Sequence, residues 1–197
     1  MRWSFNMFQD LVLKNRSYRR FFEEEKITQD TLLKLVDYAR LVPSGANKQA
    51  LRYCLASEES YNDHIFETLG WAGYLKDWQG PVAGERPAAY IILLQDSSYK
   101  MATNFDAGIV AQTILLGATE MGLGGCMIGN IQTEKLKQVL NLAENLEIVL
   151  VLALGKPKES VVIETMDEKG DIRYWRDEQQ IHHVPKRNLQ DIIINLK

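Results

Sequence analysis

The sequence predicts an α+β fold for a chain of 197 residues, a length that suits one compact domain. Two continuous apolar segments, Ala88–Leu94 and Ile148–Leu154, are typical of strands buried on both faces of a sheet. Helical segments lie between the predicted strands, but strand and helix do not alternate regularly enough for a doubly wound parallel sheet. With 46% apolar residues, the chain can bury a core of useful size.

Five segments carry helix signals, either apolar residues at helical spacing or a capping residue at the start. Thr28 and Asn188 are the expected N-caps, and Asp191 is expected to bond back to the cap backbone at Asn188. The cluster Pro43-Ser44-Gly45 ends the second helix. The predicted helices are Phe8–Asn15, the segment from Thr28 to Arg40, Asn104–Met121, Thr133–Leu140 and the segment from Asn188 to Leu196.

Shorter patterns predict the remaining strands. Leu51–Leu55 alternates apolar and other residues, as a half-buried strand does. Cys126–Ile128 is expected to form a brief strand after a run of glycines. Lys169-Gly170 is expected to turn a hairpin between Val161–Ile163 and Ile172–Trp175.

The predicted helix Asn104–Met121 has almost no polar face, because Ile109, Val110 and Ile114–Leu116 surround it. A helix that is apolar all round must be covered all round. A single chain of this size has too few other elements to do so, and we therefore expect a partner subunit.

Charge and cysteine content exclude several classes of protein. The net charge of −3 argues against general binding of nucleic acids, which requires an excess of cations. Cys54 and Cys126 form neither a disulfide framework nor a zinc or iron–sulfur ligand set. No apolar run of membrane-spanning length is present, and residues 1–10 do not resemble a signal peptide, which makes the cytoplasm the expected compartment and a membrane partner unexpected.

Arg16, Arg19 and Arg20 form the densest basic cluster, with Ser17 beside them. Guanidinium groups match phosphate oxygens in a bidentate geometry, and a serine hydroxyl adds a neutral donor. If the pair Lys186-Arg187 near the C-terminus meets this cluster, the site would hold a phosphate monoester of about −1.5 to −2 charge. The alternative is a set of solvated surface arginines.

Two further segments offer ligand contacts. Pro43–Gln49 combines small residues with hydrogen-bonding groups, which lets a flat ligand approach the backbone, although it can equally be a plain loop. Cys126–Asn130 exposes backbone N–H groups after a short strand. The preceding glycines are no dinucleotide fingerprint, because they follow a helix instead of a strand.

Other chemistry is not predicted. The three histidines are His64, His182 and His183, and the adjacent pair points to opposite faces if extended, so it forms no metal site by itself. No catalytic triad, GxSxG or HExxH pattern occurs. The sequence thus predicts neither a metal centre nor a protein nucleophile.

Taken together, five motifs in order resemble the nitroreductase family of FMN-dependent NAD(P)H oxidoreductases. They span most of the chain and are Asn15–Phe21, Pro43–Gln49, Asp106–Gln112, Gly122–Gly125 and Val184–Arg187. The resemblance implies an α+β homodimer with a mostly antiparallel central sheet flanked by helices, a long apolar helix at the dimer interface and exchange of C-terminal arms. It implies one FMN-binding domain, 1–197, with a variable lid segment at 60–86 and a C-terminal arm at 177–197.

The resemblance also assigns cofactor contacts residue by residue. Arg16, Ser17 and Arg19 would hold the FMN phosphate and ribityl chain, and Lys186 and Arg187 would complete the phosphate site. The residues expected to line the flavin from the other subunit are Pro43, Ser44, Gly45, Asn47 and Gln49. Those expected to run along the ring, with a backbone N–H bonded to N5, are Ile128, Gly129 and Asn130.

The implied activity is ping-pong hydride transfer through flavin N5, from NAD(P)H to a small-molecule electron acceptor such as a quinone or nitroaromatic. Because the flavin supplies the chemistry, no catalytic side chain is needed. Trp71, Tyr74 and Trp78 in the lid segment would stack on substrate, or would pack as part of an ordinary amphipathic helix. The alternatives are a flavoenzyme of narrower chemistry (reductive dehalogenation or flavin breakdown) and a non-catalytic flavin-binding sensor or storage protein.

Overall fold

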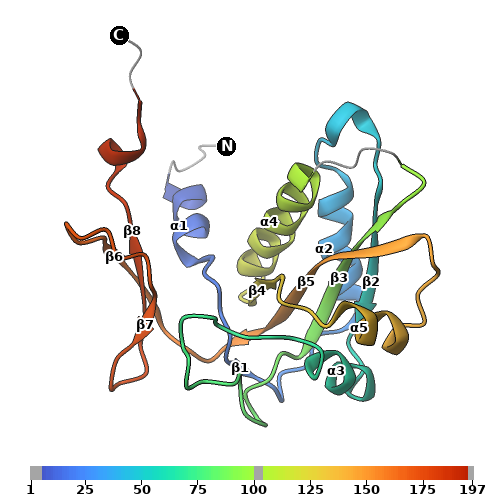
Figure 1. Cartoon of the computed structure of the whole chain (residues 1–197), viewed down its shortest axis with the longest axis horizontal. Helices are drawn as coiled ribbons and strands as arrows, with labels where there is room; N and C mark the ends of the chain where they lie inside the picture. The colour runs from blue at the N-terminus through green and yellow to red at the C-terminus, as the bar shows by residue number, and fades with distance from the viewer. Residues whose placement is uncertain (1–5, 100–103, 195–197) are drawn as a thin grey trace.

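The protein, seen in a computed structural model that describes residues 6–99 and 104–194, is built on a five-stranded antiparallel sheet (Figure 1). The longest strand is β5 (Leu146–Pro157), which pairs with β1 (Phe21–Phe22), β3 (Ala89–Asp96) and β4 (Gly124–Ile128). The remaining strand, β2 (Leu51–Ala56), forms the edge next to β3. The predicted α+β class is confirmed, as are the two buried strands.

Helices cover both faces of this sheet because β3 buries alternate residues on each side. Ile91 and Leu93 pack under α2 (Gln29–Arg40) and α4 (Asn104–Glu120). Tyr90 and Ile92 pack on the opposite face with α3 (Glu59–Phe66) and α5 (Thr133–Val139). The sheet therefore separates two apolar clusters, one on each side.

A second sheet lies apart from the first and holds three strands, β6 (Val161–Thr165), β8 (His182–Lys186) and β7 (Trp175–Arg176). It follows β5 in the chain and stands beside α1 (Asn6–Lys14), at the left of Figure 1. We call β6–β8 the C-terminal sheet. It forms one wall of the site described below.

Local signals at the second helix are confirmed, since the Thr28 hydroxyl accepts the backbone N–H of Thr31 at 3.2 Å and caps α2. The hairpin predicted around Lys169-Gly170 is wrong. Gly170 does occupy a turn with a positive φ of 72°, but β6 pairs in parallel with β8, and β7 pairs with the other edge of β8. A parallel pair cannot be joined by a tight turn, and the intervening chain makes the crossover.

The predicted C-terminal helix is wrong as well. After Asn188 the chain makes only a short 3₁₀ turn, Leu189–Ile192, and Leu196 lies outside the described residues. The Asn188 side chain donates to the Asp191 carboxylate at 3.3 Å instead of capping a backbone N–H. In the lid segment, helix α3 ends at Phe66, and Trp71, Tyr74 and Trp78 lie beyond it and outside any helix.

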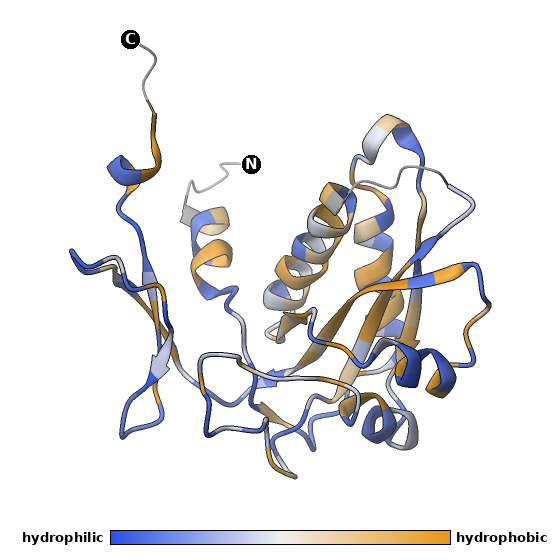
Figure 2. Ribbon diagram, in the orientation of Figure 1, coloured by the Kyte–Doolittle hydropathy of each residue, from blue (hydrophilic) through white to orange (hydrophobic). Residues whose placement is uncertain are grey.

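Helix α4 is buried along one face and open along another. Val110, Ala111 and Ile114 pack in the core, whereas Phe105 is 78% exposed and Ile109 is 41% exposed. Apolar side chains of α1 and of the C-terminal segment are exposed too, and Figure 2 shows hydrophobic residues among the polar ones in both segments. They are Met7, Phe8, Val12, Leu13, Leu189, Ile192, Ile193 and Ile194. In the described ranges, no helix combines the length and apolar character needed to cross a bilayer.

Candidate functional site

Residues 16–19, which we call the clamp segment, connect α1 to β1 and run along the edge of the central sheet. Ser17 forms a parallel bridge with Gly125 of β4, and the backbone N–H of Tyr18 donates to the Gly125 carbonyl at 3.1 Å. The approach is close, because a Cβ on the neighbouring Gly124 would lie 2.5 Å from the Tyr18 ring. Glycines at this point of β4 therefore let the clamp segment lie flat against the sheet.

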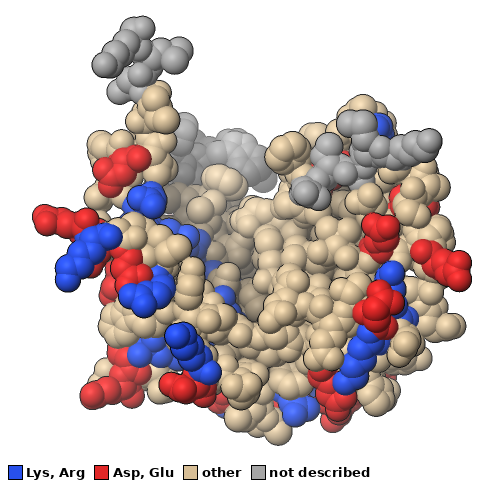
Figure 3. All heavy atoms as spheres, in the orientation of Figure 1, with Lys and Arg blue, Asp and Glu red and all other residues tan. Residues whose placement is uncertain are grey.

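The clamp segment and the C-terminal sheet enclose a hollow of about 300 Å³ that opens beside α4 (Figure 3). Three cations line it, Arg16, Arg19 and Lys186, together with the hydroxyl-bearing Ser17. No aspartate or glutamate is among the lining residues, all of which lie in the described ranges. We call this cavity the basic hollow; its charge favours an anion.

The three cations keep their charge available for a ligand. Within residues 6–99 and 104–194, none of Arg16, Arg19 and Lys186 forms an ion pair. Arg16 donates to the Val12 carbonyl at 2.7 Å, and Arg19 donates to the Ser17 carbonyl at 3.1 Å. Neutral carbonyl partners orient a guanidinium without cancelling its charge.

His182 lies at the base of the basic hollow and is almost fully buried. Its Nε2 is 3.4 Å from the Arg19 guanidinium, and its ring lies 5.1 Å from that of Tyr174. Burial lowers the pKa of His182 to about 4, with Arg19 and Arg176 adding to the effect. The imidazole is therefore neutral near pH 7, and it can accept a hydrogen bond from Arg19.

The predicted basic residues divide between three places. Lys186 lines the basic hollow, but Arg187 lies at a separate cavity beside Asp167, Glu168 and Asp191. Lys186 ends β8 and Arg187 follows it, and successive residues of an extended chain point to opposite faces, so the two cations line different cavities. Arg20, the third arginine of the basic cluster, bonds Glu85 through Nε at 2.5 Å and through Nη2 at 2.7 Å.

Residues 43–49 form a second pocket, on the other side of α4 from the C-terminal sheet (Figure 1). The buried Asp106 of α4 accepts the Gly45 N–H through both carboxylate oxygens, at 3.0 and 3.2 Å. Asn47 and Gln49 have positive φ angles of 52° and 49°, which are unusual for residues other than glycine. Pro43, Ser44 and Gln49 line this pocket, which shares no lining residue with the basic hollow.

Residues 128–130 begin at the last residue of β4 and contact the lid segment at Gly70. Ile128 is buried, and its neighbour Met127 is the β4 residue that lines the basic hollow. The Asn130 carbonyl accepts the Gly70 N–H at 2.8 Å. A Cβ on Gly70 would lie 2.0 Å from the Asn130 side chain, so a larger residue at position 70 would displace that side chain. Gly129 has open space around it.

The three aromatic residues of the lid segment pack against the chain itself. Trp71 contacts the Phe66 ring at 5.6 Å, Tyr74 contacts Tyr174 at 5.0 Å, and Trp78 lies 4.3 Å from the Arg176 guanidinium. None of the three lines the basic hollow. Their assignment to substrate stays a prediction.

Comparison with known proteins now gives the family. The model described as the nitroreductase family matches residues 12–156, which include the clamp segment, the 43–49 pocket and β4. The chain belongs to the nitroreductase family.

Nitroreductase-family relatives cover most of the chain. It is 28% identical over 165 residues to the Bacillus subtilis protein named FMN reductase (NADPH), a match covering 75% of this chain and 65% of that protein. It is 22% identical over 188 residues to an NADPH-dependent oxidoreductase of Staphylococcus saprophyticus, covering 89% of this chain and 72% of that one. A nitroreductase family protein from Clostridium novyi has the same fold, with a TM-score of 0.64, 20% identity and coverage of 95% and 99% of the two chains.

Sequence analysis missed three residues at the site: His182 as a lining residue, and Glu159 and Arg176 behind the clamp segment. Glu159 accepts backbone N–H groups of Arg19 and Arg20, the second at 3.2 Å, and pairs with Arg176 at 2.9 Å. No local pattern marks a single buried glutamate in a turn. The expectation that the adjacent histidines point to opposite faces is the only sequence signal that bears on His182, and it did not place this residue at the site.

The pair of Arg20 with Glu85 generates a pH-dependent prediction. The hydrogen bond from Arg20, followed by that from Lys158, lowers the pKa of Glu85 from 4.5 to about 2. A carboxyl group with a lowered folded-state pKa contributes stability above its unfolded pKa, and this stability is lost as pH falls through the folded value.

We therefore expect Glu85→Gln to lower the free energy of unfolding at pH 7 by about 1.5–3 kcal/mol, the usual contribution of a hydrogen bond to a charged group. The difference from the wild type should shrink steadily between pH 5 and pH 3. Urea unfolding of both proteins at pH 7, 5 and 3 checks this, and a difference that stays constant over that range would contradict it.

Proposed function

We propose that the protein is an FMN-dependent NAD(P)H oxidoreductase. The observation that carries the proposal is the basic hollow, in which Arg16, Arg19 and Lys186 surround a cavity with no acidic lining residue. A phosphate monoester carries about −1.5 to −2 charge near pH 7, which three unpaired cations balance well. Family membership and the name of the Bacillus subtilis relative both support a flavin as the molecule that carries this phosphate.

The residues present fit this cofactor. Arg16 and Arg19 offer planar N–H donors, Ser17 offers a hydroxyl, and the unpartnered Nε of Arg16 is a buried donor among the described residues. Bound FMN would supply hydride transfer between a nicotinamide and an acceptor, and that chemistry needs no protein nucleophile. The chain's own part is to bind the phosphate, orient the cofactor and keep the site's histidine neutral.

One subunit supplies only part of such a site. The 43–49 pocket and the basic hollow lie on different sides of α4, so both can contact one flavin only if the 43–49 segment comes from a second copy. The exposed Phe105 and Ile109 of α4, together with Leu189 and residues 192–194, give that copy an apolar surface to cover. We therefore propose a homodimer in which the part of the C-terminal arm, 177–197, that follows β8 crosses to the partner.

The acceptor is proposed at the level of class. A quinone or nitroaromatic would follow NAD(P)H at the same place, by ping-pong hydride transfer through flavin N5. The alternatives are a narrower flavoenzyme activity and a non-catalytic flavin-binding role. The turnover assay below separates an enzyme from a protein that only binds flavin. The lid segment at 60–86 and a cytoplasmic location also stay predictions.

The first prediction is that the purified protein binds FMN and that NADH or NADPH bleaches the flavin absorbance in the absence of oxygen. Addition of a quinone or a nitroaromatic should reoxidise the flavin and restore its absorbance. With excess NADH or NADPH, the protein should then reduce the acceptor catalytically. Anaerobic absorbance spectroscopy checks both steps. Protein that stays colourless after incubation with FMN would contradict the proposal, and bound flavin that no nicotinamide reduces would favour the binding role.

Removal of a clamp guanidinium should weaken cofactor binding. Arg16→Ala and Arg19→Ala are each expected to cost about 1–3 kcal/mol of FMN affinity, the usual range for a lost charged hydrogen bond. Fluorescence titration of FMN measures the loss, with Lys135→Ala, which removes an exposed cation on α5, as the control. Full flavin affinity in both arginine variants would refute the clamp.

Dimer formation should depend on the exposed face of α4. The wild type is expected to be dimeric at micromolar concentration, and Phe105→Glu should shift it to the monomer because a charge replaces a 78% exposed ring at the proposed interface. Leu33→Glu on α2, also an exposed apolar position, is the matched control. Light scattering measures the molecular mass of the wild type and of both variants. A monomeric wild type would contradict the proposed interface.

A further inference from the structure

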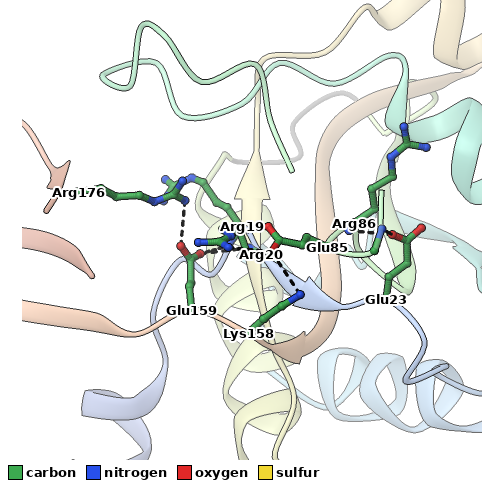
Figure 4. Close-up of polar contacts among 9 residues, drawn as sticks. Arg19, Arg20, Glu23, Glu85, Arg86, Lys158, Glu159 and Arg176 are labelled. Carbon is green, nitrogen blue, oxygen red and sulfur yellow. Dashed lines mark hydrogen bonds and ion pairs between the residues drawn. The ribbon is translucent and has the colours of Figure 1, made fainter. Parts of the chain in front are cut away.

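Glu159 lies in the turn between β5 and β6, and its side chain has no exposure to solvent. One carboxylate oxygen accepts the backbone N–H groups of Arg19 and Arg20, and the other accepts from Arg176 at 2.9 Å. Figure 4 shows Arg176 reaching toward this carboxylate from the opposite side to the clamp segment. A single buried carboxylate therefore fixes the backbone that carries Arg19.

A negative charge at this position opposes the proposed function. The basic hollow must hold an anion, yet Glu159 lies directly behind Arg19, in a buried environment where charges are poorly screened. Its hydrogen bonds to the backbone require an acceptor but not a full charge. Some cation must balance Glu159, and the three cations that line the hollow are needed for the ligand.

Arg176 is placed to provide that balance. Its side chain is only 9% exposed and does not line the basic hollow. The Trp78 ring of the lid segment covers it at 4.3 Å, which shields the ion pair from water. Its charge is felt in the hollow, because Arg176 is one of the groups that lower the pKa of His182.

We propose that Arg176 is a specificity-determining residue for phosphorylated flavin, because it cancels the charge of Glu159 and leaves the clamp cations free for the phosphate. The inference rests on the proposed function and deepens it. Arg176 does not touch the phosphate in this account. Trp78 contributes by covering the ion pair, which gives the lid segment a role in cofactor selection.

The test compares the dissociation constants of FMN and riboflavin, which differ by the phosphate alone. Arg176→Gln should reduce the preference for FMN over riboflavin about tenfold, since an unbalanced buried charge then repels the phosphate. Glu159→Gln should keep or increase the preference, because the amide oxygen still accepts from the backbone while the charge is gone. The double variant Arg176→Gln/Glu159→Gln should recover the wild-type preference, and Arg176→Lys should retain most of it.

Arg86→Gln is the matched control. Arg86 has the same two kinds of partner as Arg176, an ion pair with Asp63 at 3.1 Å and an aromatic ring, Phe66, at 4.4 Å, but it lies away from the hollow (Figure 4). Its loss should not change the ratio of the two dissociation constants. A merely structural role for Arg176 would weaken both flavins equally, and the double variant would then bind no better than Arg176→Gln.

The outcomes separate the two claims. If the wild type prefers FMN and Arg176→Gln keeps that preference, this inference is overturned and the proposed function stands. If Glu159→Gln alone loses the preference for FMN, the negative charge of Glu159 supports FMN binding instead of opposing it. The inference is then overturned as well. A wild type that binds neither flavin overturns the proposed function together with the inference.

Discussion

The buried carboxylate of Glu159 is the interaction on which the site depends. Two segments that are distant in sequence meet at it, the chain at the end of the clamp segment through the backbone N–H groups of Arg19 and Arg20, and the C-terminal sheet through Arg176. The lid segment adjoins this pair, because the Trp78 ring lies over the Arg176 guanidinium. A buried carboxylate without these partners would cost several kcal/mol. The hydrogen bonds that stabilise Glu159 therefore also hold the clamp segment against the C-terminal sheet. The basic hollow is the space between these two segments.

The second constraint is that the hollow is only one wall of the proposed flavin site. Helices α1 and α4 carry exposed apolar side chains such as Phe8 and Phe105, and burying them against a second chain would be favourable. The segment 43–49, held by Asp106 in an unusual backbone conformation, offers hydrogen-bonding groups on the far side of α4. A symmetric pair of chains satisfies both features at once, because it covers the apolar surface and brings the second segment to the flavin.

Sequence alone predicted what is local. The clamp arginines lie within four residues of each other, Thr28 marks the start of α2, and the continuous apolar residues of β3 reflect its burial on both faces. The C-terminal sheet was not predictable in this way, since β7 has two residues and β6 pairs in parallel across a crossover. The separation of Lys186 from Arg187 could be predicted only once the end of β8 was known. The pairing of Glu159 with Arg176 has no signature in the local sequence.

The central claim is that the basic hollow binds the phosphate of a flavin. A crystal structure of the protein with FMN tests it most directly. The account predicts the phosphate within hydrogen-bond distance of Arg16, Arg19 and Lys186, with His182 beneath it and the flavin ring beside α4. A structure in which FMN binds with its phosphate in solvent, or at another surface such as the cavity beside Arg187, would contradict the account.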